Sequence, residues 1–345
     1  MAVSTKLLTL ASTFLAAVSL SHAASAASPM EDIYKGKSIT LLIGFGPGGG
    51  YDTYARLLAR HLGRFMAGEP TIIPQNMPGG GGLTVTNHLY NAAQPDGFTI
   101  GMFGPFTGLE PLYGNKNARF DITKFTWIGN MDVDAGICVS WHASGLTNFA
   151  DTLKKETTFG SSGKGSTTTQ QVLFLKNMLG SKIRLVLGYQ GSNEIRLAMR
   201  RGEVGATCGL YRSNAVTDLA QDLKSGDIKV LIQFGRKNLE EFGNAVNAYD
   251  LLKNDEDKQV ADIILRANES ARPVAAPPGI PVDRATELRA AFTKTMADPV
   301  FLQDARRMSL PIHPTSAEDV TNMFKELYSA PPAVVERAKM IMASE

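Results

Sequence analysis

Cysteine and histidine are scarce in this chain of 345 residues, and their positions exclude the common metal sites. The sequence has two cysteines, Cys138 and Cys208, and five histidines. None of them stands at C-x-x-C or H-x-x-x-H spacing, so we expect no bound metal. In an oxidising compartment the cysteines could form a disulfide. Buried free thiols are also common, and spacing alone does not establish the short Cα separation that a bridge requires.

The chain also lacks an excess of charge of either sign. It has 35 Lys and Arg against 33 Asp and Glu, and no long run of like charge. Such a surface has little attraction for polyanions, so we expect neither nucleic acid nor an anionic membrane as a partner.

A long apolar run occurs only near the N-terminus. Lys6 precedes a largely apolar stretch at residues 7–20, and Ala24, Ser25 and Ala26 form an A-x-A cleavage site. This pattern is typical of a secretory signal peptide, which we assign to residues 1–26. The run is shorter than the roughly 20 residues that a transmembrane helix needs, so an uncleaved anchor is the less favoured alternative. We expect a cleaved protein exported to the periplasm.

The rest of the chain alternates between short apolar segments and amphipathic segments. Between residues 39 and 103 the order is strand, helix, strand, helix, strand, and a similar alternation returns between residues 135 and 234. Such an order predicts an α/β fold in two units, with helices on the faces of largely parallel sheets. Residues 263–281 are expected to hold a return strand, and residues 284–296 and 317–327 to form closing helices.

Glycine-rich loops mark three points where a predicted strand gives way to a helix. They are "GFGPGGGYD" at 44–52, "MPGGGG" at 77–82 and "GSSGKGST" at 160–167. A helix start offers unpaired N–H groups and the positive end of the helix dipole, and glycine lets an anion approach the backbone. We therefore expect these loops to hold a carboxylate, with Asp52 as a helix N-cap. The alternative is that the glycines only form tight turns.

A nucleotide-binding or catalytic role fits these loops poorly. Gly44, Gly46 and Gly49 satisfy G-x-G-x-x-G in form, but Pro47 lies inside the motif and Glu69, at the spacing of the ribose-binding acid, stands before the second strand. The "SSGKGS" segment lacks the Ser or Thr that follows the lysine of a phosphate loop. No serine has a G-x-S-x-G context, and no pair of carboxylates stands out. We expect no cofactor and no catalytic residue.

Five segments follow one another through the chain: "GFGPGGGYDTYARLLARHL", "QNMPGGGGLTVTNHLYNAAQPDGFTIG", "TFGSSGKGSTTTQQVLFLKNMLG", "LGYQGSNEIRLAMRRGEV" and "IKVLIQFGR". In sequence, order and spacing they resemble the extracytoplasmic solute receptors of the tripartite tricarboxylate transporter family, also called TctC or Bug proteins. The resemblance covers most of the mature chain.

The resemblance implies a type II periplasmic-binding-protein fold, in which two α/β domains joined by crossover strands close on a ligand. On this basis we expect a first domain from residues 27–132 and 262–345, and a second from residues 133–261. The implied function is that of a monomeric, non-enzymatic receptor. It would capture a dicarboxylate, tricarboxylate or aromatic acid and deliver it to the membrane subunits of a tripartite tricarboxylate transporter.

The resemblance places the ligand between the glycine loop after the first strand and the Gly-Ser loop of the second domain. "YQG" at 189–191 matches a Tyr-Lys-Gly element of the family, with Gln190 in place of lysine. Arg212, just after a second-domain strand, could pair with a distal carboxylate. The expected ligand-binding residues are Phe45, Pro47, Gly48, Gly49, Gly50, Tyr51, Asp52, Phe103, Phe106, Thr107, Ser161, Ser162, Gly163, Gly165, Ser166, Thr167, Tyr189, Gln190, Gly191 and Arg212.

Two departures from the family pattern bear on the ligand and the hinge. Gly209 and Leu210 stand where relatives often place an acidic residue that could receive a ligand ammonium, so an amino acid is a less favoured ligand. The C-terminal third lacks the tryptophan-containing return strand of the relatives, which leaves the second hinge open. An exported α/β enzyme acting on a carboxylate, and a receptor that serves a sensor, remain alternatives, and the sequence does not name the acid.

Overall fold

The first lobe of the protein is built on a six-stranded mixed sheet. The structure, a computed structural model, describes residue 1, residues 29–243 and residues 245–343. The sheet has the order β12–β4–β11–β3–β1–β2, from β1 (Ser38–Ile43), β2 (Thr71–Asn76), β3 (Thr99–Met102), β4 (Thr126–Asn130), β11 (Pro273–Ala276) and β12 (Thr315–Ser316). β1 is parallel to β2 and β3, whereas β11 is antiparallel to β3 and β4. Because β11 lies inside this sheet, the chain returns to the first lobe after building the second.

The second lobe contains a second six-stranded sheet. Its order is β10–β9–β5–β8–β6–β7, from β5 (Gly136–Trp141), β6 (Thr157–Gly160), β7 (Ile183–Val186), β8 (Ala206–Tyr211), β9 (Ile228–Phe234) and β10 (Val246–Asn247). β5 is antiparallel to its neighbours β8 and β9. A disulfide joins Cys138 of β5 to Cys208 of β8, which settles the pairing that the sequence left open.

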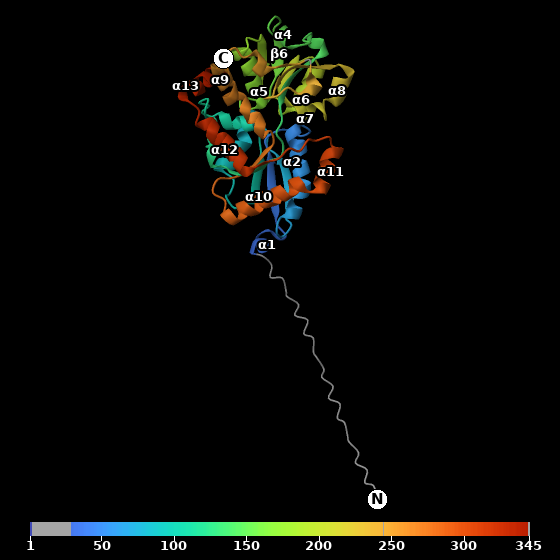
Figure 1. Ribbon diagram of the computed structural model, residues 1–345, viewed down its shortest axis with the longest axis vertical. Helices are drawn as coiled ribbons and strands as arrows, with labels where there is room; N and C mark the ends of the chain where they lie inside the picture. The colour runs from blue at the N-terminus through green and yellow to red at the C-terminus, as the bar shows by residue number, and fades with distance from the viewer. Residues whose placement is uncertain (2–28, 244, 344–345) are drawn as a thin grey trace.

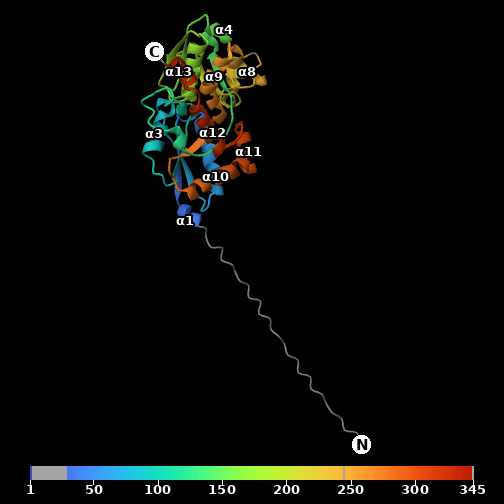
Figure 2. The ribbon, with the colours of Figure 1, turned by 60° about the vertical axis from the view of Figure 1, so that its left-hand side comes forward.

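Helices cover both sheets. Those against or below the first sheet are α1 (Pro29–Tyr34), α2 (Gly50–His61), α3 (Leu83–Asn91), α10 (Val282–Ala297), α11 (Pro299–Arg307) and α12 (Ala317–Tyr328). Those of the second lobe are α4 (Phe149–Thr152), α5 (Thr167–Leu173), α6 (Ser192–Arg200), α7 (Arg212–Ala215), α8 (Ala220–Ser225), α9 (Asp255–Leu265) and α13 (Pro332–Met342). Figure 1 shows the two lobes one above the other, with α10 in the lower lobe and α4 at the top, and Figure 2 shows the same stacking after rotation. In the described part of the chain, no helix is long and apolar enough to cross a membrane.

Short helical turns complete the connections. The 3-10 turns are η1 (Leu62–Phe65), η2 (Gly80–Gly82), η3 (Pro105–Leu109), η4 (Ile122–Lys124), η5 (His142–Ser144), η7 (Glu240–Phe242), η8 (Ala248–Leu251) and η9 (Arg266–Ser270), and the π-helical η6 (Phe174–Met178) continues α5. Helix α2 illustrates how the sequence pattern produces the fold. Its apolar positions, including Tyr54, Leu57 and Leu58, are fully buried, while Arg60 on the other face is exposed, as an amphipathic surface helix requires.

The predicted α/β architecture is correct, but several details of the prediction need correction. Asp52 is not the N-cap of α2, because Gly49 occupies that position. Residues 263–265 of the expected return strand instead end helix α9, and the strand itself begins at Pro273. Strand β4 and helices α9, α11 and α13 were not predicted. The signal peptide at residues 1–26 falls outside the described residues, apart from Met1, and stays a prediction.

The chain crosses between the lobes more than once, and this complicates the domain boundaries. Helices α9 and α13 pack against each other, and Val260, Ile264 and Ala338 belong to the hydrophobic cluster around the second sheet. The expected first domain included residues 262–345, and its boundaries stay a prediction. We propose to count α13 and the end of α9 with the second domain, because their apolar side chains are buried there.

Candidate functional site

A small cavity lies between the lobes, beside the loops that follow β1 and β6. Its volume is about 30 Å³, space for about one or two water molecules. It is lined by Phe45, Gly49, Gly50, Tyr51, Ser162, Ser166, Thr167, Thr168, Gly191, Ser192, Gly209, Tyr211, Asn214 and Arg272. The lining therefore combines residues from both lobes with one residue, Arg272, from the return crossover.

Direct backbone contacts hold the lobes together around this cavity. The N–H of Gly46 in the first lobe donates to the carbonyl of Gln190 in the second, at 2.8 Å. Gly81 packs so closely on the opposite loop that an added Cβ would lie 2.6 Å from the backbone nitrogen of Ser166. Its φ of +72° also favours glycine. The "MPGGGG" loop is thus a contact surface for the second lobe, and only the other two glycine loops line the cavity.

The first-lobe wall of the cavity is the start of helix α2. Gly49 and Gly50 lie at this helix start and in the lining. The loop before them is held by Asp52, whose carboxylate accepts hydrogen bonds from the N–H of Gly48 at 3.0 Å, from Arg56 Nε at 2.9 Å and from Asn76 Nδ2 at 2.8 Å. Burial alone would raise the pKa of Asp52, but these hydrogen bonds outweigh burial and lower it. Asp52 therefore fixes the loop as an anion and does not itself line the cavity.

The second-lobe wall is a cluster of buried hydroxyl groups. Ser166 caps helix α5 by accepting a hydrogen bond from the N–H of Thr169 at 3.2 Å, and it donates to the carbonyl of Gly163 at 2.7 Å. The Thr168 hydroxyl lies 2.6 Å from the Ser166 hydroxyl and 2.8 Å from that of Ser161. These bonds preorganise the loop so that Ser162 and Thr167 face the cavity with their positions fixed.

A third helix start completes the ring of backbone donors. Gly191 and Ser192 lie at the beginning of α6 and line the cavity. Gly49 of the first lobe lies against Ser192, since a Cβ on Gly49 would be 3.0 Å from the Ser192 hydroxyl. The first turns of α2 and α6 therefore meet across the cavity, and each offers unpaired N–H groups at the positive end of its dipole.

Arg272 places a formal positive charge in this site. Its side chain is only 1% exposed, and its guanidinium carbon lies 4.8, 4.7 and 4.4 Å from the ring centres of Tyr51, Tyr54 and Tyr211. Such distances are within the range of cation–π attraction. The rings come from helix α2 and from the end of β8, so both lobes hold this one side chain.

The hydrogen bonds of Arg272 leave part of its donor capacity unused. Nη2 donates to the hydroxyl of Ser213 at 3.0 Å, and Nη1 donates to the carbonyl of Ala271 at 3.0 Å. The buried Nε has no hydrogen-bond partner among the residues that the structure describes. Among the residues that the structure describes, no Asp or Glu lines the cavity or forms an ion pair with Arg272. A guanidinium has five N–H donors and stays charged, so this is a buried cation without a direct counter-ion.

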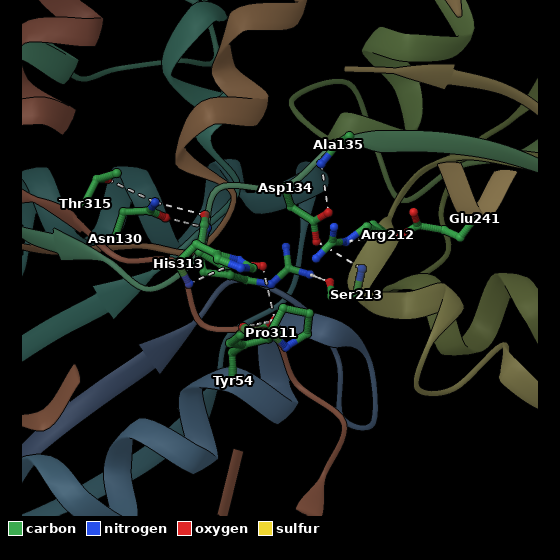
Figure 3. Close-up of polar contacts among 12 residues, drawn as sticks. Tyr54, Asn130, Asp134, Ala135, Arg212, Ser213, Glu241, Pro311, His313 and Thr315 are labelled. Atoms are coloured by element: carbon green, nitrogen blue, oxygen red, sulfur yellow. Dashed lines mark hydrogen bonds and ion pairs between the residues drawn. The ribbon is translucent and has the colours of Figure 1, made fainter. Parts of the chain in front are cut away.

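Two aspartates lie near Arg272, at the crossover from β4 to β5. Burial and the nearby Asp134 raise the pKa of Asp132 to about 7, and His313 and Arg272 only partly offset this. Asp132 Oδ1 lies 2.8 Å from Nδ1 of His313, and Tyr54 donates to Oδ2 at 3.3 Å. Figure 3 shows Asp134 turned toward Ala135 and Ser213 instead. Its carboxylate accepts hydrogen bonds from the N–H groups of these two residues at 2.8 and 3.1 Å. Neither carboxylate neutralises the guanidinium directly.

The structure brings together fewer than half of the residues expected to bind the ligand. The lining includes Phe45, Gly49, Gly50, Tyr51, Ser162, Ser166, Thr167 and Gly191. Outside it lie Pro47, Gly48, Asp52, Phe103, Phe106, Thr107, Ser161, Gly163, Gly165, Tyr189, Gln190 and Arg212. The role of each as a ligand contact stays a prediction.

The residues outside the lining have other partners in the structure. Phe103 and Phe106 belong to the first-lobe hydrophobic cluster, and Thr107 donates across the lobes to the carbonyl of Gly165 at 3.0 Å. Arg212 Nε lies 3.5 Å from Glu241 Oε1, and Figure 3 shows the two residues beside each other.

Sequence reasoning missed several residues of the lining. They are Thr168, Ser192, Gly209, Tyr211, Asn214 and Arg272. A signal for Arg272 was present, because an arginine between small and apolar residues in "ESARPVAAPP" is unusual for a solvent-exposed loop. Within the described ranges, no group of three His, Cys, Asp or Glu is placed to hold a metal ion.

The chain is similar to known solute-binding proteins in sequence and in fold. The family model described as "Tripartite tricarboxylate transporter family receptor" matches residues 54–339. A UPF0065 protein of Bordetella pertussis is 26% identical over 302 residues, which are 84% of this chain and 85% of that protein. The periplasmic binding protein BugD has a similar fold, with a TM-score of 0.70 and 18% identity over 89% of this chain and 98% of BugD.

A structure with a bound ligand is also among the similar folds. MatC from Rhodopseudomonas palustris, solved with bound malate, aligns with a TM-score of 0.68 and 17% identity, over 90% of this chain and 100% of MatC. At this identity the likeness establishes the shared two-lobed fold.

Proposed function

Because the chain belongs to the receptors of the tripartite tricarboxylate transporter family, we propose that it binds an organic carboxylate between its two lobes. One observation carries the proposal. The starts of α2 and α6, the hydroxyls of Ser162 and Thr167 and the guanidinium of Arg272 converge on a cavity that no carboxylate side chain lines in the described structure. All of these groups are hydrogen-bond donors or positive ends of dipoles, which is the environment that an anion requires.

The energetics require both lobes to take part. Micromolar affinity corresponds to about 8 kcal/mol. One helix start contributes about 0.3–1 kcal/mol, or ~2 kcal/mol when partly buried, and a hydrogen bond to a charged group about 1.5–3 kcal/mol. No single loop reaches the required total, whereas two helix starts and several donors do. A cavity of about 30 Å³ is too small for an organic acid, so the lobes must separate for entry and close again over the solute.

The lining also supports a binding role over an enzymatic one. In the described structure it holds no His, Cys, Asp, Glu or Lys, which are among the groups that transfer protons in catalysis. It does hold Tyr51 and Tyr211, but burial raises the pKa of both phenols, which makes them poor bases. We propose that the mature protein is a periplasmic monomer that delivers its solute to the membrane subunits of a tripartite tricarboxylate transporter. The malate bound to MatC, a protein of similar fold, supports a dicarboxylate as one candidate solute.

A thermal-shift screen over carboxylic acids, followed by calorimetry, tests the proposal. A ligand that binds only the folded state stabilises it by about 2.7 kcal/mol at 100 times its Kd, so we expect a raised unfolding midpoint with at least one aliphatic or aromatic acid. The matched amides, which keep the shape and lose the charge, should have no effect. The proposal fails if no acid binds, or if the bound acid is recovered chemically altered after incubation.

A further inference from the structure

We propose that Arg272 binds the carboxylate of the solute directly and that it restricts the solutes to acids without an adjacent ammonium group. The inference rests on the proposed function and names the residue and the ligand class within it. Its starting point is the burial of the guanidinium, which is 1% exposed and lines the cavity. Arg272 is thus available to a solute enclosed between the lobes and to little else.

The surroundings of Arg272 are incomplete without an anion. A buried charge is costly unless a counter-charge or hydrogen bonds compensate it. The described part of the chain supplies two neutral acceptors, the hydroxyl of Ser213 and the carbonyl of Ala271, and no partner for Nε. A carboxylate has the geometry to accept two parallel hydrogen bonds from a guanidinium. A solute carboxylate would therefore supply the partner that the described residues do not.

The position of the guanidinium coincides with the backbone site for an anion. A Cβ added to Gly50 would lie 3.1 Å from Nη2 of Arg272, so the charged group lies directly against the first turn of α2. The glycine at position 50 keeps this approach open. One carboxylate can therefore contact the start of α2 and Arg272 at the same time, and the full charge reinforces the helix dipole.

The same arrangement disfavours an ammonium group on the solute. In the described structure the lining contains no carboxylate to receive it, and Gly209, which is part of the lining, has no side chain to do so. Tyrosine rings can bind an ammonium through their faces, but the rings of Tyr51, Tyr54 and Tyr211 already surround the guanidinium. An amino acid would place its ammonium beside Arg272 and two positive helix ends, where like charges repel.

Calorimetry with matched pairs of ligands tests whether the unmodified mature protein prefers acids that lack an ammonium group. The pairs are succinate and L-aspartate, glutarate and L-glutamate, and 3-phenylpropanoate and L-phenylalanine, which differ only by the ammonium group. We expect every acid that binds to do so at least ~100-fold more tightly than its amino derivative. Equal or tighter binding of the amino derivative would overturn the proposed discrimination against an ammonium group and leave the proposed function intact.

Variants test the contact itself with whichever acid binds. Arg272→Met removes the charge at similar volume and should weaken binding ~100-fold or more, and Arg272→Lys, which keeps the charge but not the planar fork, ~10-fold. Arg236→Gln is the matched control, because Arg236 is an exposed arginine paired with Asp262 and Glu269. Circular dichroism verifies that each variant is folded. Should Arg272→Met fail to fold, Arg272→Lys and the matched ligand pairs still decide the matter.

The outcomes separate the inference from the function on which it rests. Unchanged affinity in both folded Arg272 variants would overturn the role of Arg272 while the receptor function stands. Absence of binding by every acid in the unmodified protein would overturn the proposed function itself.

Discussion

The two loops that line the cavity reach a fixed shape by different means. In the first lobe one carboxylate, that of Asp52, binds Gly48, Arg56 and Asn76. In the second lobe several hydroxyls of residues 161–169 bond to one another and to the loop backbone. The first loop therefore depends on one ionised side chain, whereas the second distributes the same task over a network. A single substitution should therefore lower the free energy of unfolding more in the first-lobe loop than in the second-lobe loop.

The sheets beneath these loops differ as well. The second sheet carries the disulfide between β5 and β8, directly before Gly209, whose added Cβ would lie 2.3 Å from the backbone nitrogen of Thr168. The cysteines of the chain are both used in this lobe, so the first sheet has no such link. The hydroxyl network thus rests on a covalently joined sheet.

Removing the disulfide should have the largest effect. A cross-link that closes a loop of this size, with a sequence separation of 70, contributes about 4 kcal/mol to the free energy of unfolding. We expect the double variant Cys138→Ser, Cys208→Ser to lose roughly that amount in urea unfolding.

The tryptophans allow each lobe to be followed separately in that experiment. Trp127 lies in the first lobe and Trp141 in the second, so Trp141→Phe and Trp127→Phe backgrounds leave one reporter each. The midpoint reported by Trp141 should fall further than that reported by Trp127. Equal displacement of both would show that the lobes unfold as one unit and would contradict the contrast between them.

Asp132, at the crossover between the lobes, should make the stability of the protein depend on pH. The pKa of Asp132 is raised from 3.8 to about 7 in the folded protein. Between these values the folded state binds a proton that the unfolded state does not, so stability falls as pH rises from about 4 to 7. We expect about 2.7 kcal/mol less stability at pH 8 than at pH 5, because two pKa units lie between pH 5 and the folded pKa of about 7 and each unit corresponds to about 1.4 kcal/mol.

Asp132→Asn is the control for this pH effect, because it removes the titrating group and keeps the shape. In this variant the unfolding free energies measured in urea at pH 5 and at pH 8 should differ much less than they do in the unmodified protein. An unchanged difference in the variant would assign the effect to other groups, of which His313, 2.8 Å from Asp132, is the nearest.

Loss of the anchoring carboxylate in the first-lobe loop should cost somewhat less. Asp52→Ala removes hydrogen bonds that involve a charged acceptor, each of which contributes about 1.5–3 kcal/mol. The net loss in unfolding free energy should be about 2 kcal/mol, because Gly48 and Arg56 are exposed enough to bond to water instead and Asn76 keeps its bond to the carbonyl of Phe45. We also expect faster amide exchange at residues 46–50. Preserved protection of these amides would show that contacts across the lobes, and not Asp52, fix the loop.

The smallest effect is expected in the second-lobe loop. Ser166→Ala removes the N-cap of α5, which costs about 1 kcal/mol, while Ser161, Thr168 and Thr169 retain bonds to one another. Urea unfolding of this variant beside Asp52→Ala tests the contrast directly. A larger loss for Ser166→Ala than for Asp52→Ala would reverse the conclusion about the two loops.

Features that depend on neighbouring residues in the chain could be predicted from the sequence, whereas features that depend on residues distant in the chain could not. The strand ends and glycine loops were predicted because glycine and hydroxyl residues mark such turns locally. The small and apolar neighbours of Arg272 indicate that it is buried, but its partners were not predictable, because the tyrosines around it come from α2 and β8, more than 60 residues away in the chain. The packing of Phe103 against Trp127 is likewise a contact between distant segments of the chain, and the role of Phe103 as a ligand contact stays a prediction.

The helices that were overlooked have a different explanation. Helix α9 lies in a polar stretch, and its apolar residues Val260, Ile263 and Ile264 were interpreted in part as a strand, since a short apolar run fits either structure. Helix α13 begins at two consecutive prolines, which suit a helix start but were not recognised as one.

The most direct test of the account is a crystal structure of the protein with the acid that binds most tightly. We expect one carboxylate of that acid to lie between the starts of α2 and α6, with an oxygen about 2.9 Å from the guanidinium of Arg272. An acid bound elsewhere, or one whose carboxylate faces away from Arg272 and from both helix starts, would contradict the account.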